Sequence, residues 1–193
     1  MPLSPFCARN GLVLERPLAR GWSATVHLVR HAKSGRLLAL KCVREKSPRK
    51  DLCAREVTHL SLANTLGIGP LLYAYDPQEQ IVLMEYVEGA TLPLWLDTNP
   101  SPVRLQNTLS LLMAQARALD GAGLSHGQLA GRGKNILVRK SGEPVIIDFE
   151  KASAKRRARN AFQLESLLFR NPRGALAQKV RGTLGISFDA GLA

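Results

Sequence analysis

The chain lacks the features that mark secreted, zinc-stapled or membrane-spanning proteins. Its three cysteines, Cys7, Cys42 and Cys53, form no Cys-x-x-Cys motif, so neither a zinc ribbon nor a disulfide framework is expected. No stretch reaches the roughly 18 uninterrupted apolar residues that a membrane helix needs, and residues 1–6 do not resemble the start of a signal peptide. These absences predict a cytoplasmic protein with reduced thiols and no membrane partner.

Acidic residues are scarce relative to basic ones. The 193 residues include 27 Lys and Arg but 15 Asp and Glu, which gives a formal net charge of +12. From Lys151 onward nine Lys and Arg stand against two acidic residues, so this tail carries +7 of that charge, most densely over Lys155 to Arg159. The excess predicts an anionic partner such as RNA or a ribonucleoprotein surface, although a solvated basic strip explains the run equally well.

The hydrophobic pattern changes character near Glu88. Before it, short apolar runs separated by turn residues predict strands over 12–18, 25–29, 37–43, 71–75 and 81–86, with a helix over 47–63. After it, helical spacing predicts a long helix over 102–121, a hairpin over 135–138 and 145–149, and a last helix from Asn160, capped through Gln163, that ends before Asn171. The sequence thus predicts an α+β fold with a β-rich lobe over 1–87 and a truncated, mostly helical lobe over 88–193.

Lys41 and Glu56 are two charged residues in apolar surroundings. Lys41 lies in a strand that is apolar on both faces, where an ammonium group needs a partner because its burial alone is costly. Glu56 falls in the apolar stripe of the following helix, among Leu52, Leu60 and Ala63. A buried Lys41–Glu56 ion pair explains both anomalies. The alternative is a snorkelling Lys41 beside a Glu56 at the edge of the stripe.

Oxygen ligands recur at one end of the predicted hairpin in the second lobe. Asp148 stands near the end of an apolar strand, and Asn135 ends a loop one hairpin earlier. A carboxylate and an amide oxygen on one side of a cleft suit Mg²⁺, which prefers hard oxygen ligands. His126, just before this loop, is expected to be a structural hydrogen-bonding residue.

Taken together and in this order, Lys41, Glu56, Asn135 and Asp148 resemble the protein-kinase-like superfamily. Over about residues 14–152 the chain is similar to its minimal atypical members, the RIO kinases and the small kinase of the tRNA-modifying KEOPS complex, and the run 148–153 looks like a group of predicted serine/threonine kinases. The resemblance implies that Lys41 contacts the α and β phosphates of ATP, that Glu56 orients Lys41, and that Asn135 and Asp148 bind Mg²⁺. Met84 would gate the adenine pocket.

The resemblance also implies a nucleotide-binding surface in the first lobe. The segment 18–26 stands where kinases carry a glycine-rich phosphate loop, with Gly21 retained and two alanines at the other glycine positions, while 83–89 resembles the adenine-binding hinge. An ordinary hairpin turn and an acidic loop are the respective alternatives. The implied nucleotide contacts are Ala19, Gly21, Ala24, Val26, Ala39, Lys41, Met84, Glu85 and Val87.

Three departures from the family pattern bear on activity. Gln128 replaces the catalytic aspartate, in a loop to Asn135 that is two residues longer than usual. Glu150 replaces the glycine of Asp-Phe-Gly, which removes a flexible hinge and offers a substitute base. No Ala-Pro-Glu motif follows, so the platform on which ordinary protein kinases dock peptides is missing.

Two functions remain in competition. The leading interpretation is an atypical ATP-dependent serine/threonine kinase or ATPase, associated with RNA or a ribonucleoprotein and with a protein partner. The alternative is a pseudokinase that acts as an ATP-binding or interaction module. A small-molecule kinase is less favoured because such enzymes use a larger acceptor lobe.

Overall fold

The structure is a computed structural model that describes residues 5–44 and 51–187. The chain divides into two compact units, Met1–Val87 and Glu88–Ala193. The first is rich in strands and the second is mostly helical, so the predicted α+β class is confirmed. Within the described ranges, no helix is long and apolar enough to cross a membrane.

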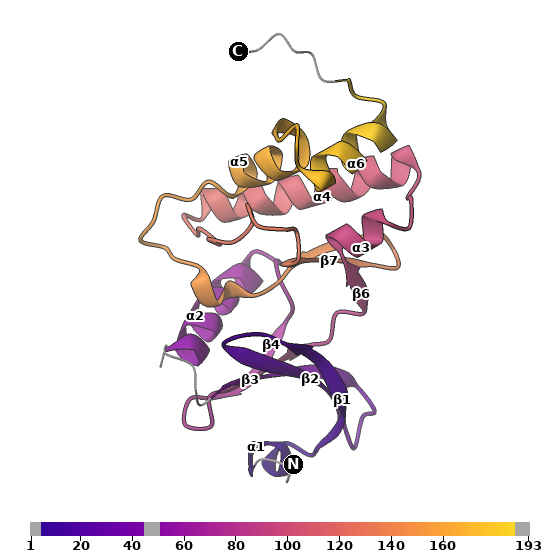
Figure 1. Cartoon of the computed structure of the whole chain (residues 1–193). Helices are drawn as coiled ribbons and strands as arrows, with labels where there is room; N and C mark the ends of the chain where they lie inside the picture. The colour runs from indigo at the N-terminus through magenta and orange to yellow at the C-terminus, as the bar shows by residue number, and fades with distance from the viewer. Residues whose placement is uncertain (1–4, 45–50, 188–193) are drawn as a thin grey trace. The chain divides into compact units, whose positions relative to one another are not determined.

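A five-stranded antiparallel sheet forms the first unit, in the order β1-β2-β3-β5-β4 (Figure 1). The strands β1, β2 and β3 form the expected meander, and β4 and β5 form the expected hairpin. The bounds of the elements are α1 Pro5–Arg9, β1 Leu12–Arg20, β2 Ala24–His31, β3 Leu37–Val43, α2 Leu52–Thr65, β4 Leu72–Asp76 and β5 Ile81–Glu85.

The two faces of this sheet are covered by different helices. Side chains alternate along β3, so Leu38 and Leu40 point to one face and Ala39 and Lys41 to the other. Leu38 and Leu40 belong to a buried cluster that includes Phe6 of α1. Lys41 instead contacts α2, which lies across the sheet from α1 (Figure 1). One face is therefore an apolar core, and the other carries a buried charge.

Helix α4, Pro102–Gly121, is the longest element of the second unit, and α5 and α6 pack beside it (Figure 1). The predicted apolar stripe of α4 is buried along its length: Leu105, Leu109, Leu112, Ala116 and Leu119. A three-stranded sheet, β6-β7-β8, completes the unit. Its elements are β6 Gly89–Thr91, α3 Leu92–Leu96, β7 Ile136–Arg139, β8 Pro144–Ile146, the 3-10 turn η1 Phe149–Lys151, α5 Asn160–Glu165, the π-helical turn η2 Ser166–Arg170 and α6 Ala175–Leu184.

The structure corrects several sequence predictions in the second unit. The strand expected over 145–149 ends at Ile146, because Asp148 adopts a left-handed backbone (φ 70°, ψ 71°) and Phe149 opens η1. The predicted capping by Asn160 and Gln163 is wrong, since α5 has no side-chain cap of its own. The helix from Asn160 stops before Asn171 as expected, but α6 follows it. In the first unit, the predicted helix start at 47–48 lies outside the described residues.

Candidate functional site

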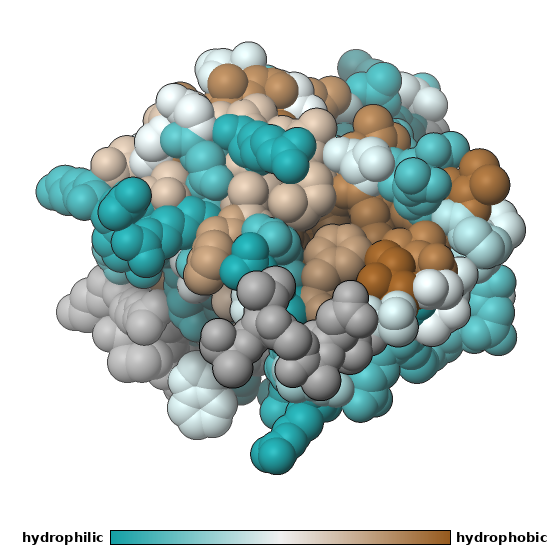
Figure 2. Space-filling view, turned by 90° about the horizontal axis from the view of Figure 1, so that it is seen from above, coloured by the Kyte–Doolittle hydropathy of each residue, from teal (hydrophilic) through white to brown (hydrophobic). Residues whose placement is uncertain are grey.

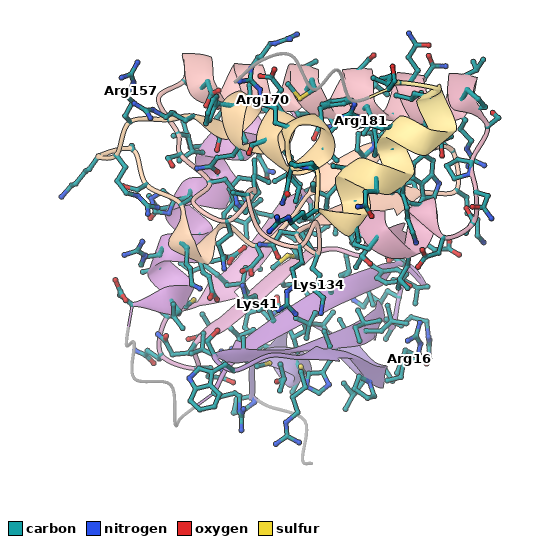
Figure 3. The ribbon with its side chains drawn as sticks, turned by 45° about the horizontal axis from the view of Figure 1, so that its top comes forward. Arg16, Lys41, Lys134, Arg157, Arg170 and Arg181 are labelled. Carbon is teal, nitrogen blue, oxygen red and sulfur yellow. The ribbon has the colours of Figure 1, made fainter. Side chains whose placement is uncertain are left out.

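A buried ion pair joins β3 to α2, as the sequence predicts. The Nζ atom of Lys41 lies 2.7 Å from Oε2 of Glu56, and the two residues are 9% and 2% exposed (Figure 3 labels Lys41). One turn before Glu56, burial raises the pKa of the Cys53 thiol, with the nearby negative charges of Asp76 and Glu56 acting in the same direction. The thiol thus stays neutral, and the Glu56 carboxylate pairs with the Lys41 ammonium group.

The sheet face around Lys41 is small and apolar. Residues directly opposite each other in antiparallel strands share a face, and Lys41 stands opposite Val26 on β2 and Val82 on β5. By the same register, Ala39 stands opposite Met84. The predicted nucleotide contacts that share this face with Lys41 are Ala19, Ala24, Val26, Ala39 and Met84. Such a surface can accept a flat apolar ring beside a cation.

Gly21 lies in the turn between β1 and β2, where a phosphate loop was predicted. Its amide donates to the Ala24 carbonyl oxygen (2.8 Å), and the Arg44 guanidinium donates to the carbonyl oxygens of Gly21 and Trp22 (3.3 and 3.4 Å). Gly21 is not in the left-handed region, so this turn does not require a glycine for its backbone conformation. Its role in binding phosphate stays a prediction.

The segment after β5 was predicted to be an adenine-binding hinge. The Glu85 amide donates to the Leu71 carbonyl oxygen (2.8 Å), which ties the end of β5 to the start of β4, and Val87 is buried. In the second unit, Glu88 accepts a hydrogen bond from Lys140 (2.9 Å). That hydrogen bond, with the Lys140 charge, lowers the pKa of the Glu88 carboxyl. The hinge role of Glu85 and Val87 stays a prediction.

His126 has the structural role that the sequence predicts. The residue is fully buried, its Nε2 donates to the Ile147 carbonyl oxygen (3.0 Å), and its ring meets Phe149 edge-on at 4.9 Å between centroids. Both the segment containing Gln128 and the segment containing Asp148 belong to the second unit, and these contacts hold the two segments together.

Three residues with oxygen-bearing side chains lie around the end of the β7–β8 ladder. The Ile147 amide donates to the Asn135 carbonyl oxygen (2.9 Å), so Asn135 lies across from the residue that precedes Asp148. Carboxylate oxygens of Asp148 and Glu150 lie within 4.8 Å of each other, and Glu150 is 6% exposed. Two carboxylates this close repel each other unless a cation is shared. The Asp148 and Glu150 carboxylates therefore form a donor set that fits Mg²⁺, which takes hard oxygen ligands, and a part for the Asn135 side chain stays a prediction.

Gln128 lies between His126 and Asn135, on the loop where the family places an aspartate. Its backbone oxygen accepts from the Gly131 amide (3.2 Å), which closes a tight turn. Its side-chain Oε1 is buried and has no hydrogen-bond partner among the described residues. The amide can orient a hydroxyl group but cannot take its proton.

Sequence reasoning missed a buried network that supports this loop. Asn160, fully buried at the start of α5, accepts from the His126 amide (2.9 Å) and donates to the Leu124 carbonyl oxygen (2.8 Å). Asp120, at the end of α4, accepts from the Asn160 amide (2.7 Å) and from the Ala161 amide (3.0 Å), so it caps α5 from another helix. The sequence held no signal for this network, because the burial of Asn160 is a tertiary feature.

We expect Asn160→Ala to lower the free energy of unfolding by about 3 kcal/mol, because it leaves Asp120, Leu124 and the His126 amide without a buried partner. Urea unfolding followed by circular dichroism measures the change. Asn107→Ala, an exposed substitution on α4, is the matched control and should stay within about 0.5 kcal/mol. Equal losses in the two variants would contradict the network.

No known protein-family model matches the chain. Among curated proteins, it is 32% identical to KEOPS complex subunit Bud32 of Pyrococcus abyssi over 102 residues, which are 52% of this chain and 44% of that protein. It is 28% identical to the probable serine/threonine-protein kinase PknB of Lactococcus lactis over 160 residues, which are 77% of this chain and 24% of that protein. The chain thus spans less than half the length of each relative. These similarities support a relationship to the protein-kinase-like superfamily.

Proposed function

We propose that this protein is an atypical ATP-dependent serine/threonine kinase. The observation that carries the proposal is the buried Lys41–Glu56 ion pair beside a small, apolar sheet face. A buried charged pair is seldom kept for stability alone, because an apolar pair of similar volume is often as stable or more so. A functional task for the ammonium group is the better explanation, and the kinase relatives point to phosphate binding.

The residues have distinct roles in this proposal. Lys41 binds the α and β phosphates of ATP, held in place by Glu56, while Ala39 and Met84 contact the adenine ring. Asn135 and Asp148 would hold Mg²⁺, which neutralises the charge that develops on the phosphates, while Glu150 beside Asp148 can serve as a base. The hydroxyl oxygen of serine or threonine bonds to the γ phosphorus as the bond to the β–γ bridging oxygen breaks. ADP leaves, and the hydroxyl proton passes to a base.

We expect Lys41→Met and Asp148→Ala each to reduce the rise in melting temperature that Mg-ATP produces. The first removes the phosphate-facing cation and the second a metal ligand, while ligand binding stabilises the folded state by mass action. Thermal-shift titration measures the rise, each variant being compared with its own ligand-free form. Lys33→Met, in the exposed turn between β2 and β3, is the control and should respond like the wild type. No shift of the wild type at millimolar Mg-ATP would rule out nucleotide binding in that range.

A pseudokinase is the second candidate, and Gln128 is the observation that favours it. Without an aspartate at this position, the loop lacks the usual proton acceptor. Mass spectrometry of the protein after incubation with Mg-ATP separates the two functions. A mass increase of one phosphoryl group supports the kinase, whereas ATP binding without phosphoryl transfer or ATP hydrolysis supports the pseudokinase.

The basic segment after η1 supports a further part of the proposal, which is association with a polyanion such as RNA or a ribonucleoprotein. Lys155, Arg156, Arg157 and Arg159 are all exposed, and no ion pair neutralises them among the described residues. Hydrophilic side chains project from the margins of the face shown in Figure 2, and Figure 3 shows Arg157 pointing away from the ribbon. A cytoplasmic location and a protein partner belong to the same proposal, since one relative is a complex subunit.

We expect replacement of all four basic residues, Lys155, Arg156, Arg157 and Arg159, by glutamine to weaken the salt dependence of RNA binding. The plot of log affinity for single-stranded RNA against log salt concentration should become flatter. Each lost phosphate contact reduces the slope by about 0.7, so four contacts change it by about 3. Fluorescence anisotropy at several salt concentrations measures the slope. A control with Arg16, Arg20, Lys33 and Arg117 replaced by glutamine carries the same net charge. An unchanged slope in the first variant, or the same change in both, would exclude a specific role for the segment.

A further inference from the structure

The basic loop Lys151–Arg159 is attached to the loop that carries Gln128. Ser125 and Ser153 form a pair of backbone hydrogen bonds (3.0 and 2.8 Å), which fixes the start of the basic loop. At its far end, the side chain of Asn160 accepts from the His126 amide. Both ends of the basic loop are therefore anchored within three residues of Gln128, and all of these residues belong to the second unit.

Gly127 brings the two loops into close contact. Its backbone has φ +80°, and a Cβ built on it would lie 2.6 Å from Nη2 of Arg156 and 2.8 Å from the Lys151 carbonyl oxygen. The Arg156 guanidinium donates to that same carbonyl oxygen. Any side chain at position 127 would push this group away, so the glycine is what allows Arg156 to lie beside the residue that precedes Gln128.

The positive charge of Arg156 and Arg157 is not balanced by the loop that carries Gln128. Gln128 is neutral, and no acidic side chain forms an ion pair with Arg156 or Arg157 among the described residues. Asp148 and Glu150 are the carboxylates in neighbouring segments, and they gather at the end of the β7–β8 ladder. The guanidinium groups consequently remain available to an external anion.

We propose that Arg156 and Arg157 bind the acidic side chains of a polypeptide whose serine or threonine is the acceptor. This assignment of a substrate class rests on the proposed kinase function. Guanidinium groups pair with carboxylates through two parallel hydrogen bonds, and an extended peptide would present its hydroxyl to the Gln128 loop while its acidic neighbours contact the basic loop. Ion pairs with Arg156 and Arg157 would thereby hold the peptide in place of the docking platform of ordinary protein kinases.

The composition of the loop favours an acidic polypeptide over RNA as the ligand of Arg156 and Arg157, and RNA binding by the same two residues is the competing outcome. Single-stranded RNA is usually held by aromatic side chains on which bases stack, and residues 151–159 include none. The nearest exposed aromatic residue along the chain, Phe162, lies outside the loop, and the Arg170 guanidinium lies over its ring at 5.7 Å from the centre. The loop thus offers charge without an aromatic stacking surface.

Binding of three fluorescent probes to the full chain tests the proposal: a serine peptide flanked by glutamates, the same peptide flanked by glutamines, and an oligouridine RNA. We expect the glutamate peptide to bind about tenfold more tightly than the glutamine peptide. Arg156→Gln with Arg157→Gln should remove this preference, while Arg117→Gln with Arg173→Gln, which makes the same change in net charge at exposed sites, should keep it. The conservative Arg156→Lys should lose part of the preference, because lysine lacks the planar fork.

Each outcome decides the matter. Preferential RNA binding, an equal effect of the two charge-matched variants, or equal binding of the two peptides would overturn the acidic-peptide site. Phosphate transfer to the bound glutamate peptide, followed in the same samples with labelled ATP, tests the kinase function separately. Arginine-dependent binding without transfer would support the docking site and contradict the proposed enzyme.

Discussion

Replacing Glu56 with leucine is expected to lower the free energy of unfolding by about 3 kcal/mol, because it leaves the Lys41 ammonium buried without its carboxylate. Lys41 is 9% exposed and its Nζ lies 2.7 Å from Glu56, so water cannot fully replace the lost partner. Urea unfolding of the variant and the wild type measures the difference. A loss below about 1 kcal/mol would mean that Lys41 reaches solvent when its partner is removed.

The double variant Lys41→Met with Glu56→Leu isolates the pair. An apolar pair of similar volume removes both charges from the interior, so we expect the double variant to recover most of the stability that Glu56→Leu loses. The surface pair of Arg30 and Glu15 is the natural comparison, since its atoms are equally close (2.6 Å) but a third or more of each side chain is exposed. Glu15→Leu should cost less than about 1 kcal/mol. Additive losses in the double variant would show that the two residues do not interact energetically.

This pair also shows what the sequence could predict and why. A lysine in a strand that is apolar on both faces and a glutamate in an apolar helical stripe are local anomalies, visible without a structure. The stripe of α4 was predictable for the same reason, since five buried residues recur at helical spacing. Periodicity and misplaced charge are local signals, and they were enough to predict the Lys41–Glu56 pair and the apolar stripe of α4.

The hydrogen-bond network of Asn160 could not be predicted in the same way. The partners of Asn160 lie 34 to 40 residues away in the sequence, and no local pattern indicates which residues they are. The end of β8 was mispredicted because the apolar residues 145–147 and Phe149 have strand character, while the left-handed backbone of Asp148 is a tertiary feature. The helix α6 was missed because its buried face includes Arg181, which disguises the stripe. Tertiary context decided each of these cases.

Gln128, which stands where the family has a catalytic aspartate, belongs to a site whose other predicted residues lie close together. Asp148, Asn135 and Glu150 gather at the end of one ladder, and His126 holds the Gln128 loop against the same segment. Phosphoryl transfer depends mainly on positioning and charge neutralisation, so such a site can act slowly without its aspartate. Loss of a positioned base typically costs roughly 100- to 10,000-fold in rate.

We therefore expect Gln128→Asp to raise the rate of autophosphorylation or ATP hydrolysis by about 100-fold. The substitution converts an amide whose Oε1 is buried without a partner into a carboxylate that can accept the hydroxyl proton. The Arg156 guanidinium lies beside Gly127, so a positive charge stands next to the residue that precedes position 128. Steady-state rates at equal ATP occupancy measure the effect, with Gln106→Asp on the exposed face of α4 as the matched control.

Glu150→Gln completes the test, because Glu150 is the other group that can serve as the base. If Gln128→Asp accelerates turnover and Glu150→Gln reduces it only modestly, position 128 is where the proton is accepted. If Glu150→Gln abolishes turnover while Gln128→Asp changes little, Glu150 has taken over that role, in keeping with its burial and its closeness to Asp148. Rates for both variants and the wild type that equal the no-enzyme control would refute the enzyme and leave the pseudokinase, because Lys41, Asn135 and Asp148 would then bind nucleotide without turning it over.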